Sequence, residues 1–177
     1  MKRVLVDTGP LVAIMSRADQ HHQTCVETLP HLPGPLFSCW PVITEAAWLL
    51  QRHAGAVQQL LKSVSEGFLE LLPIQSAEAG EIGKLMEKYK NIRPQLADAS
   101  LIYLAERDDF DVIFTLDRRD FSVYQAGRKG AFRIMAEPIS LYFGCANRRS
   151  ASLASFMNCP TSGFCRAMSI IALVGRR

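Results

Sequence analysis

Two short apolar runs, each followed by an aspartate, constrain the fold of this 177-residue chain more than any other feature. Residues 4–6 (VLV) precede Asp7, and residues 112–116 (VIFTL) precede Asp117. Short β-branched runs without alternation are typical of strands covered on both faces of a parallel sheet. Ligands bind beyond the carboxyl ends of such strands, so both aspartates are expected at one site. For either residue alone, capping of a helix by Asp7 or a turn at Asp117 is an equally good interpretation.

Two further carboxylates follow a proline by four residues, Glu45 after Pro41 and Asp98 after Pro94. Proline suits the first turn of a helix, so both segments are predicted to be helical. On a helix, a residue shares its face with the residues three, four and seven positions later. For Asp98 these three residues are all apolar, whereas for Glu45 they include Arg52. An unpaired buried carboxylate is costly. A salt bridge to Arg52 is therefore an alternative for Glu45, whereas Asp98 has no basic residue one turn away.

Together, the four acids stand where burial is expected, and such a set requires a cation. Hard cations such as magnesium prefer oxygen ligands, and carboxylates supply them. A cation held in this way lowers the pKa of a bound water molecule and neutralises developing charge. The sequence therefore favours a magnesium- or manganese-dependent hydrolase over an α/β domain without such chemistry.

Predicted helices and strands alternate along the chain, which is typical of an α/β sheet, and the length suits one domain. We expect a short segment rich in proline and glycine at residues 30–35 to end the second helix. Strands are predicted at about 3–7, 36–40, 68–72, 111–116 and 132–135. Helices are predicted at 10–16, from 19 to the segment at 30–35, from 41 onward, and at 55–65, 76–89 and 95–107.

Several other classes of function find no support in the sequence. It contains neither a phosphate-binding loop nor a Gly-x-Gly-x-x-Gly motif, which argues against a nucleotide cofactor. Its apolar stretches are far shorter than the roughly 20 residues of a membrane span. The four histidines lack the partners of a zinc site and are interpreted as surface or packing residues. Five cysteines without a Cys-x-x-Cys pair, and no secretory signal, predict a reduced, cytoplasmic setting.

Charge divides the chain into two parts. The net charge is +3, but residues 144–177 hold five arginines and no acid, which leaves residues 1–143 at −2. We expect 1–143 to form the domain. The basic Ser/Ala/Cys/Arg-rich segment 144–177 is predicted to be disordered or an adventitious extension, with a basic arm for nucleic acid as the alternative.

The ordered acidic motifs resemble those of PIN-domain nucleases, and in particular the VapC-type toxins of bacterial toxin–antitoxin pairs. The resemblance covers residues 1 to about 143. It implies a three-layer α/β/α sandwich around a parallel sheet, a negatively charged metal pocket and RNA cleavage that leaves a 5′-phosphate. The motifs that carry it lie at residues 6–13 (VDTGPLVA), 41–46 (PVITEA), 96–101 (LADASL) and 115–121 (TLDRRDF).

On this interpretation Asp7, Asp98 and Asp117 are direct or near-direct ligands of Mg²⁺, or of Mn²⁺ as a substitute. Glu45 completes the cage or orients the attacking water. Asp120 is expected to stabilise a turn, with the holding of a ligand through water as the alternative. Thr8 and Thr115 are expected to hydrogen-bond the acids. RNA binding would need local basic residues, and those near the expected strand ends are Arg17, Lys88, Lys90, Arg93, Arg118 and Arg119.

The resemblance also implies partners. A cognate antitoxin would cover the pocket, and the toxin would form a homodimer. The alternative is a non-catalytic PIN-like module that binds RNA or protein, in which the acids serve stability or partner contact.

Overall fold

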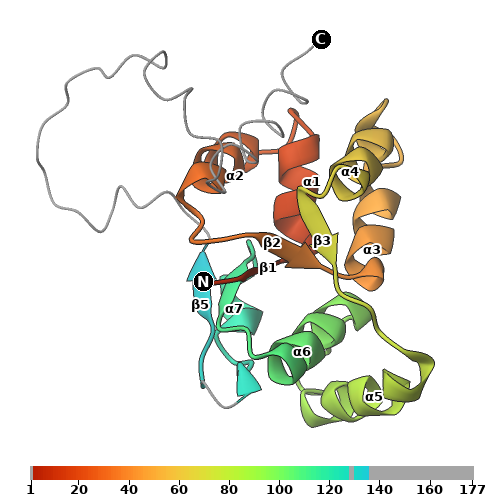
Figure 1. Cartoon of the computed structure of the whole chain (residues 1–177), viewed down its shortest axis with the longest axis vertical. Coiled ribbons are helices and arrows are strands. Elements are labelled where there is room, and N and C mark those ends of the chain that lie inside the picture. The colour runs from red at the N-terminus through yellow and green to blue at the C-terminus, as the bar shows by residue number, and fades with distance from the viewer. Residues whose placement is uncertain (1, 128–129, 136–177) are drawn as a thin grey trace, which may run out of the picture.

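A computed structural model describes residues 2–127 and 130–135 of the chain. Within them, a single sheet of parallel strands has the order β3-β2-β1-β4-β5 (Figure 1). Its strands are β1 (Val4–Val6), β2 (Leu36–Ser38), β3 (Leu69–Leu71), β4 (Val112–Phe114) and β5 (Arg133–Met135). The predicted parallel α/β sheet is confirmed.

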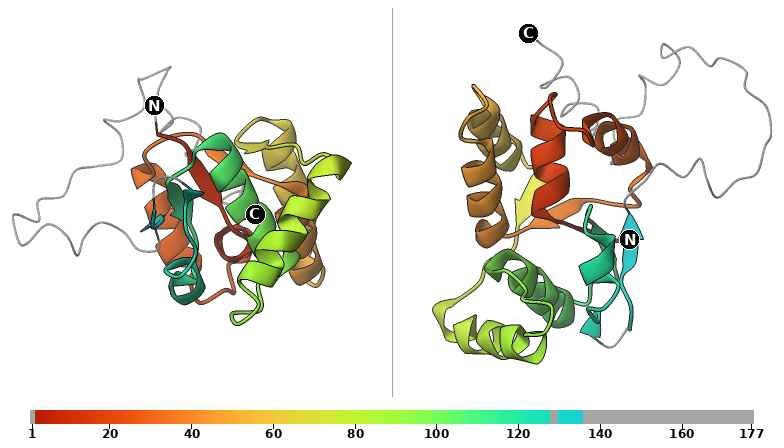
Figure 2. Two further views of the ribbon diagram at one scale, coloured as in Figure 1. Left: turned by 90° about the horizontal axis from the view of Figure 1, so that it is seen from below. Right: turned by 180° about the vertical axis from the view of Figure 1, so that it is seen from behind.

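Helices cover both faces of this sheet, which gives the expected three layers (Figures 1 and 2). The helices between β1 and β3 lie on one face, and those between β3 and β5 lie on the other. The first group contains α1 (Thr8–Met15), α2 (His22–Thr28), the 3₁₀ turn η1 (Leu29–His31), α3 (Trp40–Leu50) and α4 (Ala56–Ser65). The second contains η2 (Ser76–Glu78), α5 (Ala79–Lys88), α6 (Leu96–Asp108) and the short α7 (Arg118–Phe121).

Strands β1 and β4 are neighbours at the centre of the sheet, paired from Val4 with Val112 to Val6 with Phe114. Every residue of both strands is at most 1 % exposed, which explains why their sequences are apolar without alternation. The chain builds outward from β1 to β3 and then returns to place β4 on the other side of β1. The β1/β4 pair is therefore the switch point of the sheet, where a crevice is expected beyond the strand ends.

Several element boundaries differ from the prediction. Helix α1 begins at Thr8 rather than Pro10, and α2 begins at His22 rather than near Asp19. The predicted helix at 76–89 is divided into η2 and α5, and α7 was not expected. Pro94 is not in the first turn of α6, because it precedes Gln95, the residue that caps this helix. The predicted segment 144–177 and its boundary at 143 lie outside the described residues.

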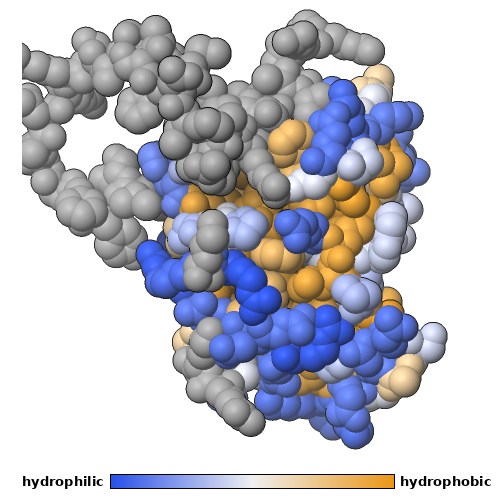
Figure 3. Space-filling model, in the orientation of Figure 1, coloured by the Kyte–Doolittle hydropathy of each residue, from blue (hydrophilic) through white to orange (hydrophobic). Residues whose placement is uncertain are grey.

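Large apolar side chains are exposed on several elements, among them Leu96 of α6 and Val123, which are 56 % and 55 % exposed, and a group on α3 and α4. Trp40, Trp48 and Leu49 of α3 are 58 %, 66 % and 45 % exposed, and Leu61 of α4 is 44 % exposed. In the view of Figure 3, apolar surface lies mainly over the half of the molecule that contains α1, α3 and α4. Among the described residues, no helix combines the length and apolar character needed to cross a membrane.

Candidate functional site

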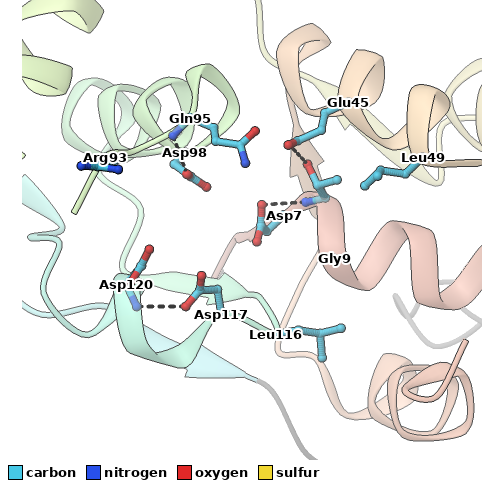
Figure 4. A pocket seen from close by; sticks show the side chains of 11 residues that line it. Asp7, Gly9, Glu45, Leu49, Arg93, Gln95, Asp98, Leu116, Asp117 and Asp120 are labelled. Carbon is cyan, nitrogen blue, oxygen red and sulfur yellow. Dashed lines mark hydrogen bonds between the residues drawn. The ribbon is translucent and has the colours of Figure 1, made fainter. Parts of the chain in front are cut away.

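An open cavity of about 500 Å³ lies beyond the carboxyl ends of β1 and β4, at the switch point of the sheet. All four acids singled out in the sequence line it, and Asp120 lines it as well. Figure 4 shows Asp7 and Asp117 at the strand ends, Glu45 on α3 and Asp98 on α6. The fold thus brings together side chains that are up to 113 residues apart in sequence, counted from Asp7 to Asp120.

Asp7 is the most buried of these acids, with 7 % of its surface exposed. It is the N-cap of α1, where its Oδ1 accepts a hydrogen bond from the Thr8 backbone N–H at 2.7 Å. Its Oδ2 accepts one from the Thr115 hydroxyl at 2.7 Å. Burial raises the pKa of Asp7 to about 7 despite these two bonds, and the charges of Asp98 and Glu45 add to the rise. Asp7 is therefore both a helix cap and a carboxylate that lacks a neutralising charge.

Glu45 faces Asp7 from α3 and is half-buried. Its Oε2 accepts a hydrogen bond from the Thr8 hydroxyl at 2.7 Å. The alternative interpretation, a salt bridge to Arg52, is wrong, because the ion pairs in the described part of the chain include no such pair. Thr8 therefore touches both acids, Asp7 through its backbone and Glu45 through its side chain.

Asp98 belongs to a capping box at the start of α6. Its Oδ2 accepts a hydrogen bond from the Gln95 backbone N–H at 2.9 Å, and the Gln95 side chain in turn caps the helix. Burial raises the pKa of Asp98, and the charges of Glu45, Asp117 and Asp120 raise it further. Gln95 also lines the cavity and was missed from the sequence, because Gln-x-x-Asp differs from the usual Ser/Thr-x-x-Glu/Gln pattern of a capping box.

Asp117 and Asp120 stand at the two ends of one short turn. Asp117 is the N-cap of α7, and its Oδ1 accepts a hydrogen bond from the Asp120 backbone N–H at 3.0 Å. The Asp117 backbone N–H donates to the hydroxyl of Thr115 at 2.9 Å. Asp120 thus stabilises the turn through its backbone N–H, as expected, whereas its side chain lines the cavity.

The donor set suits a hard divalent cation. Five carboxylates line the cavity, and like charges raise the pKa values of Asp7 and Asp98. A cation would relieve that repulsion. Among the described residues, however, no three acidic, histidine or cysteine side chains are placed closely enough to hold one metal ion together, so the closed cage expected from the sequence is not formed. Each carboxylate except Asp120 is held by its own hydrogen-bond donor. Magnesium is commonly bound by only one or two carboxylates plus water, so the arrangement still fits it.

Comparisons with known proteins agree with this fold. The model of the PIN domain family matches residues 4–126. Ribonuclease VapC26 of Mycobacterium tuberculosis (strain ATCC 25618 / H37Rv) is 28 % identical over 134 residues, which cover 75 % of this chain and 99 % of that protein. The crystal structure of M. tuberculosis VapC20, a toxin that cleaves the sarcin–ricin loop, shares the fold. Its TM-score is 0.59 at 15 % identity, over 64 % of this chain and 91 % of that one. The resemblance seen in the motifs is thus confirmed, and the chain belongs to the PIN domain family.

Proposed function

We propose that the chain is a divalent-metal-dependent endoribonuclease, the toxin of a toxin–antitoxin pair, which hydrolyses RNA phosphodiester bonds. The observation that carries the proposal is the convergence of five carboxylates on one cavity at the switch point, with Asp7 held there in spite of its burial. Membership of the PIN family and similarity to a protein named a ribonuclease support it.

Asp7, Asp98 and Asp117 are the residues that would hold Mg²⁺, or Mn²⁺ in its place, either directly or through bound water. When bound, the cation supplies a water molecule of lowered pKa and neutralises charge at the phosphate. Glu45 completes the site or orients the attacking water, because the Thr8 hydroxyl engages one of its oxygens and leaves the other available. The chain's own contribution is to hold four carboxylates in fixed positions at the end of a rigid sheet.

The proposed partners are the RNA substrate, a cognate antitoxin and a second copy of the chain, in a cytoplasmic setting. The exposed apolar side chains of α3 support an antitoxin that covers the cavity, because Leu49 both lines the cavity and is 45 % exposed beside Trp48.

The test of the proposed function is cleavage of total and transfer RNA by the purified protein, freed of any antitoxin, with Mg²⁺ or Mn²⁺. We expect discrete fragments that disappear when a chelator is added and return when the metal is restored. Isothermal titration with Mg²⁺ runs beside it. A folded protein that neither cleaves RNA nor binds metal would refute the nuclease and favour the non-catalytic binding module.

Replacing Thr115 with valine is expected to slow cleavage by about ten- to a hundredfold, the usual effect of losing a residue that orients metal ligands. Thr115 is fully buried, and its hydroxyl donates to Asp7 while it accepts from the backbone N–H of Asp117. Valine fills the same space but removes the hydrogen bonds to Oδ2 of Asp7 and from the backbone N–H of Asp117, while Asp7 keeps only its bond from Thr8. Initial cleavage rates at saturating metal measure the effect.

The matched control is Thr28→Val. Thr28 is equally buried, and its hydroxyl donates to the Thr24 carbonyl on α2, away from the cavity. This variant should lose stability without a matching loss of rate, and Thr115→Ser should restore most of the activity. Equal losses of rate in the two valine variants would show that Thr115 acts only through stability.

A further inference from the structure

Arg93 is the basic residue that lines the acidic cavity in the part of the chain that the structure describes. Of the six basic residues expected near the strand ends, Arg93 is the one that lines the cavity. Its side chain is exposed and joins none of the ion pairs formed by described residues, which use Lys62, Lys84, Lys90 and Arg107. A guanidinium group beside five carboxylates thus remains available for a ligand.

The backbone of Arg93 is in an unfavourable conformation. Its φ is 59°, in the left-handed region, where residues other than glycine, asparagine and aspartate are uncommon. It also precedes Pro94, and residues before proline normally prefer extended backbone. The surrounding structure holds it there, since the Arg93 N–H donates to the Lys90 carbonyl at 3.2 Å and Pro94 is buried. Strained residues of this kind cluster at functional sites.

The position of Arg93 in the cavity indicates what it would bind. In Figure 4, Arg93 lies at the end of the cavity beside Asp98 and Asp120, and Leu49 lies at the opposite end beyond Glu45. A polyanion that enters a site lined by five carboxylates is repelled along its whole length. A guanidinium group matches the geometry of a phosphate with two parallel hydrogen bonds and therefore offsets this repulsion at one defined point.

We propose that Arg93 binds a phosphate of the RNA backbone next to the one that is cleaved, and thereby fixes the end of the cavity at which the strand is held. The proposal rests on the ribonuclease function proposed above. It assigns substrate positioning to a side chain outside the acidic set, and it predicts that the protein requires a polynucleotide whose chain continues past the scissile bond.

The test is the binding of a fluorescein-labelled single-stranded RNA of about ten nucleotides, a length within the usual range for such sites. Fluorescence anisotropy is measured over a series of salt concentrations with Ca²⁺ in place of Mg²⁺, because Ca²⁺ also binds carboxylates but lacks the strict octahedral geometry of Mg²⁺ and should not support cleavage. Gels verify that the RNA is intact. Arg93→Gln should raise the Kd about tenfold, as expected for loss of a hydrogen bond to a charged group. It should also reduce the slope of log affinity against log salt by about 0.7, the value for one phosphate contact on a single strand.

Lys84→Gln is the matched control, since Lys84 is an exposed residue of α5 paired with Glu81 and does not line the cavity. It removes the same charge and should leave the salt slope unchanged. Arg93→Asn separates binding from folding. Asparagine tolerates the left-handed backbone, so this variant should keep or raise the Tm while it binds RNA as weakly as Arg93→Gln.

The possible outcomes distinguish this inference from the proposed function. If the unmodified protein binds and cleaves RNA but Arg93→Gln behaves like Lys84→Gln, the role of Arg93 is refuted and the ribonuclease stands. If Arg93→Asn loses stability in step with binding, Arg93 is a structural residue and the inference fails. If the unmodified protein neither binds nor cleaves RNA, both proposals are overturned.

Discussion

Replacing Asp7 with asparagine is expected to stabilise the metal-free protein and, at the same time, to slow RNA cleavage by more than about a hundredfold. The carboxylate is buried at the end of β1 with a pKa raised to about 7, so its charged form destabilises the fold. Asparagine has the same shape and carries no charge. Its Oδ1 can still accept from the Thr8 N–H, whereas its Nδ2 must donate to the Thr115 hydroxyl, which reverses that hydrogen bond. We expect a gain of about 4 kcal/mol in the free energy of unfolding at pH 8.

The gain should depend on pH in a defined direction. The pKa of Asp7 is higher in the folded protein than its ordinary value of 3.8, so folding favours the protonated form. The advantage of asparagine is therefore complete above about pH 7 and fades as the pH falls toward 3.8. Urea unfolding of both proteins at pH 8 and pH 5, in the presence of a chelator, measures it. Glu66→Gln, at an exposed surface pair with Lys62, should change neither stability nor cleavage appreciably.

Addition of Mg²⁺ gives an independent check on this variant. A bound cation neutralises the charge that burial penalises, so Mg²⁺ should raise the Tm of the unmodified protein at pH 8 more than that of Asp7→Asn. An asparagine variant that is less stable than the parent at pH 8 would show that the carboxylate of Asp7 is needed for folding itself. An asparagine variant that cleaves RNA at the parent rate would exclude Asp7 from the reaction.

The central part of the fold was predictable because local and tertiary preferences coincide there. Strands β1 and β4 are buried on both faces, so their sequences are apolar throughout. Asp7 follows β1 directly, and Asp117 follows β4 after two further residues. The beginning of α6 was not located correctly, because it depends on which residue supplies the cap. Pro94 suggested the first turn, but the hydrogen bonds of Gln95 and Asp98 place the cap one residue later.

The acids of the site were predictable as a set, whereas their individual contacts were not. Strand ends and helix faces indicated that Asp7, Glu45, Asp98 and Asp117 would converge, as the cavity shows. The hydrogen bond from Thr8 to Glu45 joins residues 37 positions apart and depends on how α1 packs against α3. The presence of Arg93 in the cavity depends on a left-handed backbone that no local pattern indicates.

Replacing Asp98 with asparagine is expected to slow cleavage by more than about a hundredfold without lowering the free energy of unfolding, because the raised pKa of Asp98 means that its charge is unfavourable in the folded protein. Asp98 has two roles, since one oxygen caps α6 through the Gln95 N–H and its side chain also lines the cavity. Asparagine can place its carbonyl oxygen on the Gln95 N–H and keep the cap. Only the negative charge in the cavity is lost, and with it a proposed metal ligand.

Two further variants separate the two roles of Asp98. Asp98→Ala loses the cap as well, so it should unfold about 0.5–2 kcal/mol more easily than Asp98→Asn, with a similar loss of cleavage. Glu78→Gln changes the corresponding acid of the other capping box, which Gln75 and Glu78 form at η2, outside the cavity. It should cleave RNA at the parent rate. If Asp98→Asn also cleaves at the parent rate and only Asp98→Ala is impaired, Asp98 acts as a helix cap alone, and the metal must be held by the acids at the strand ends.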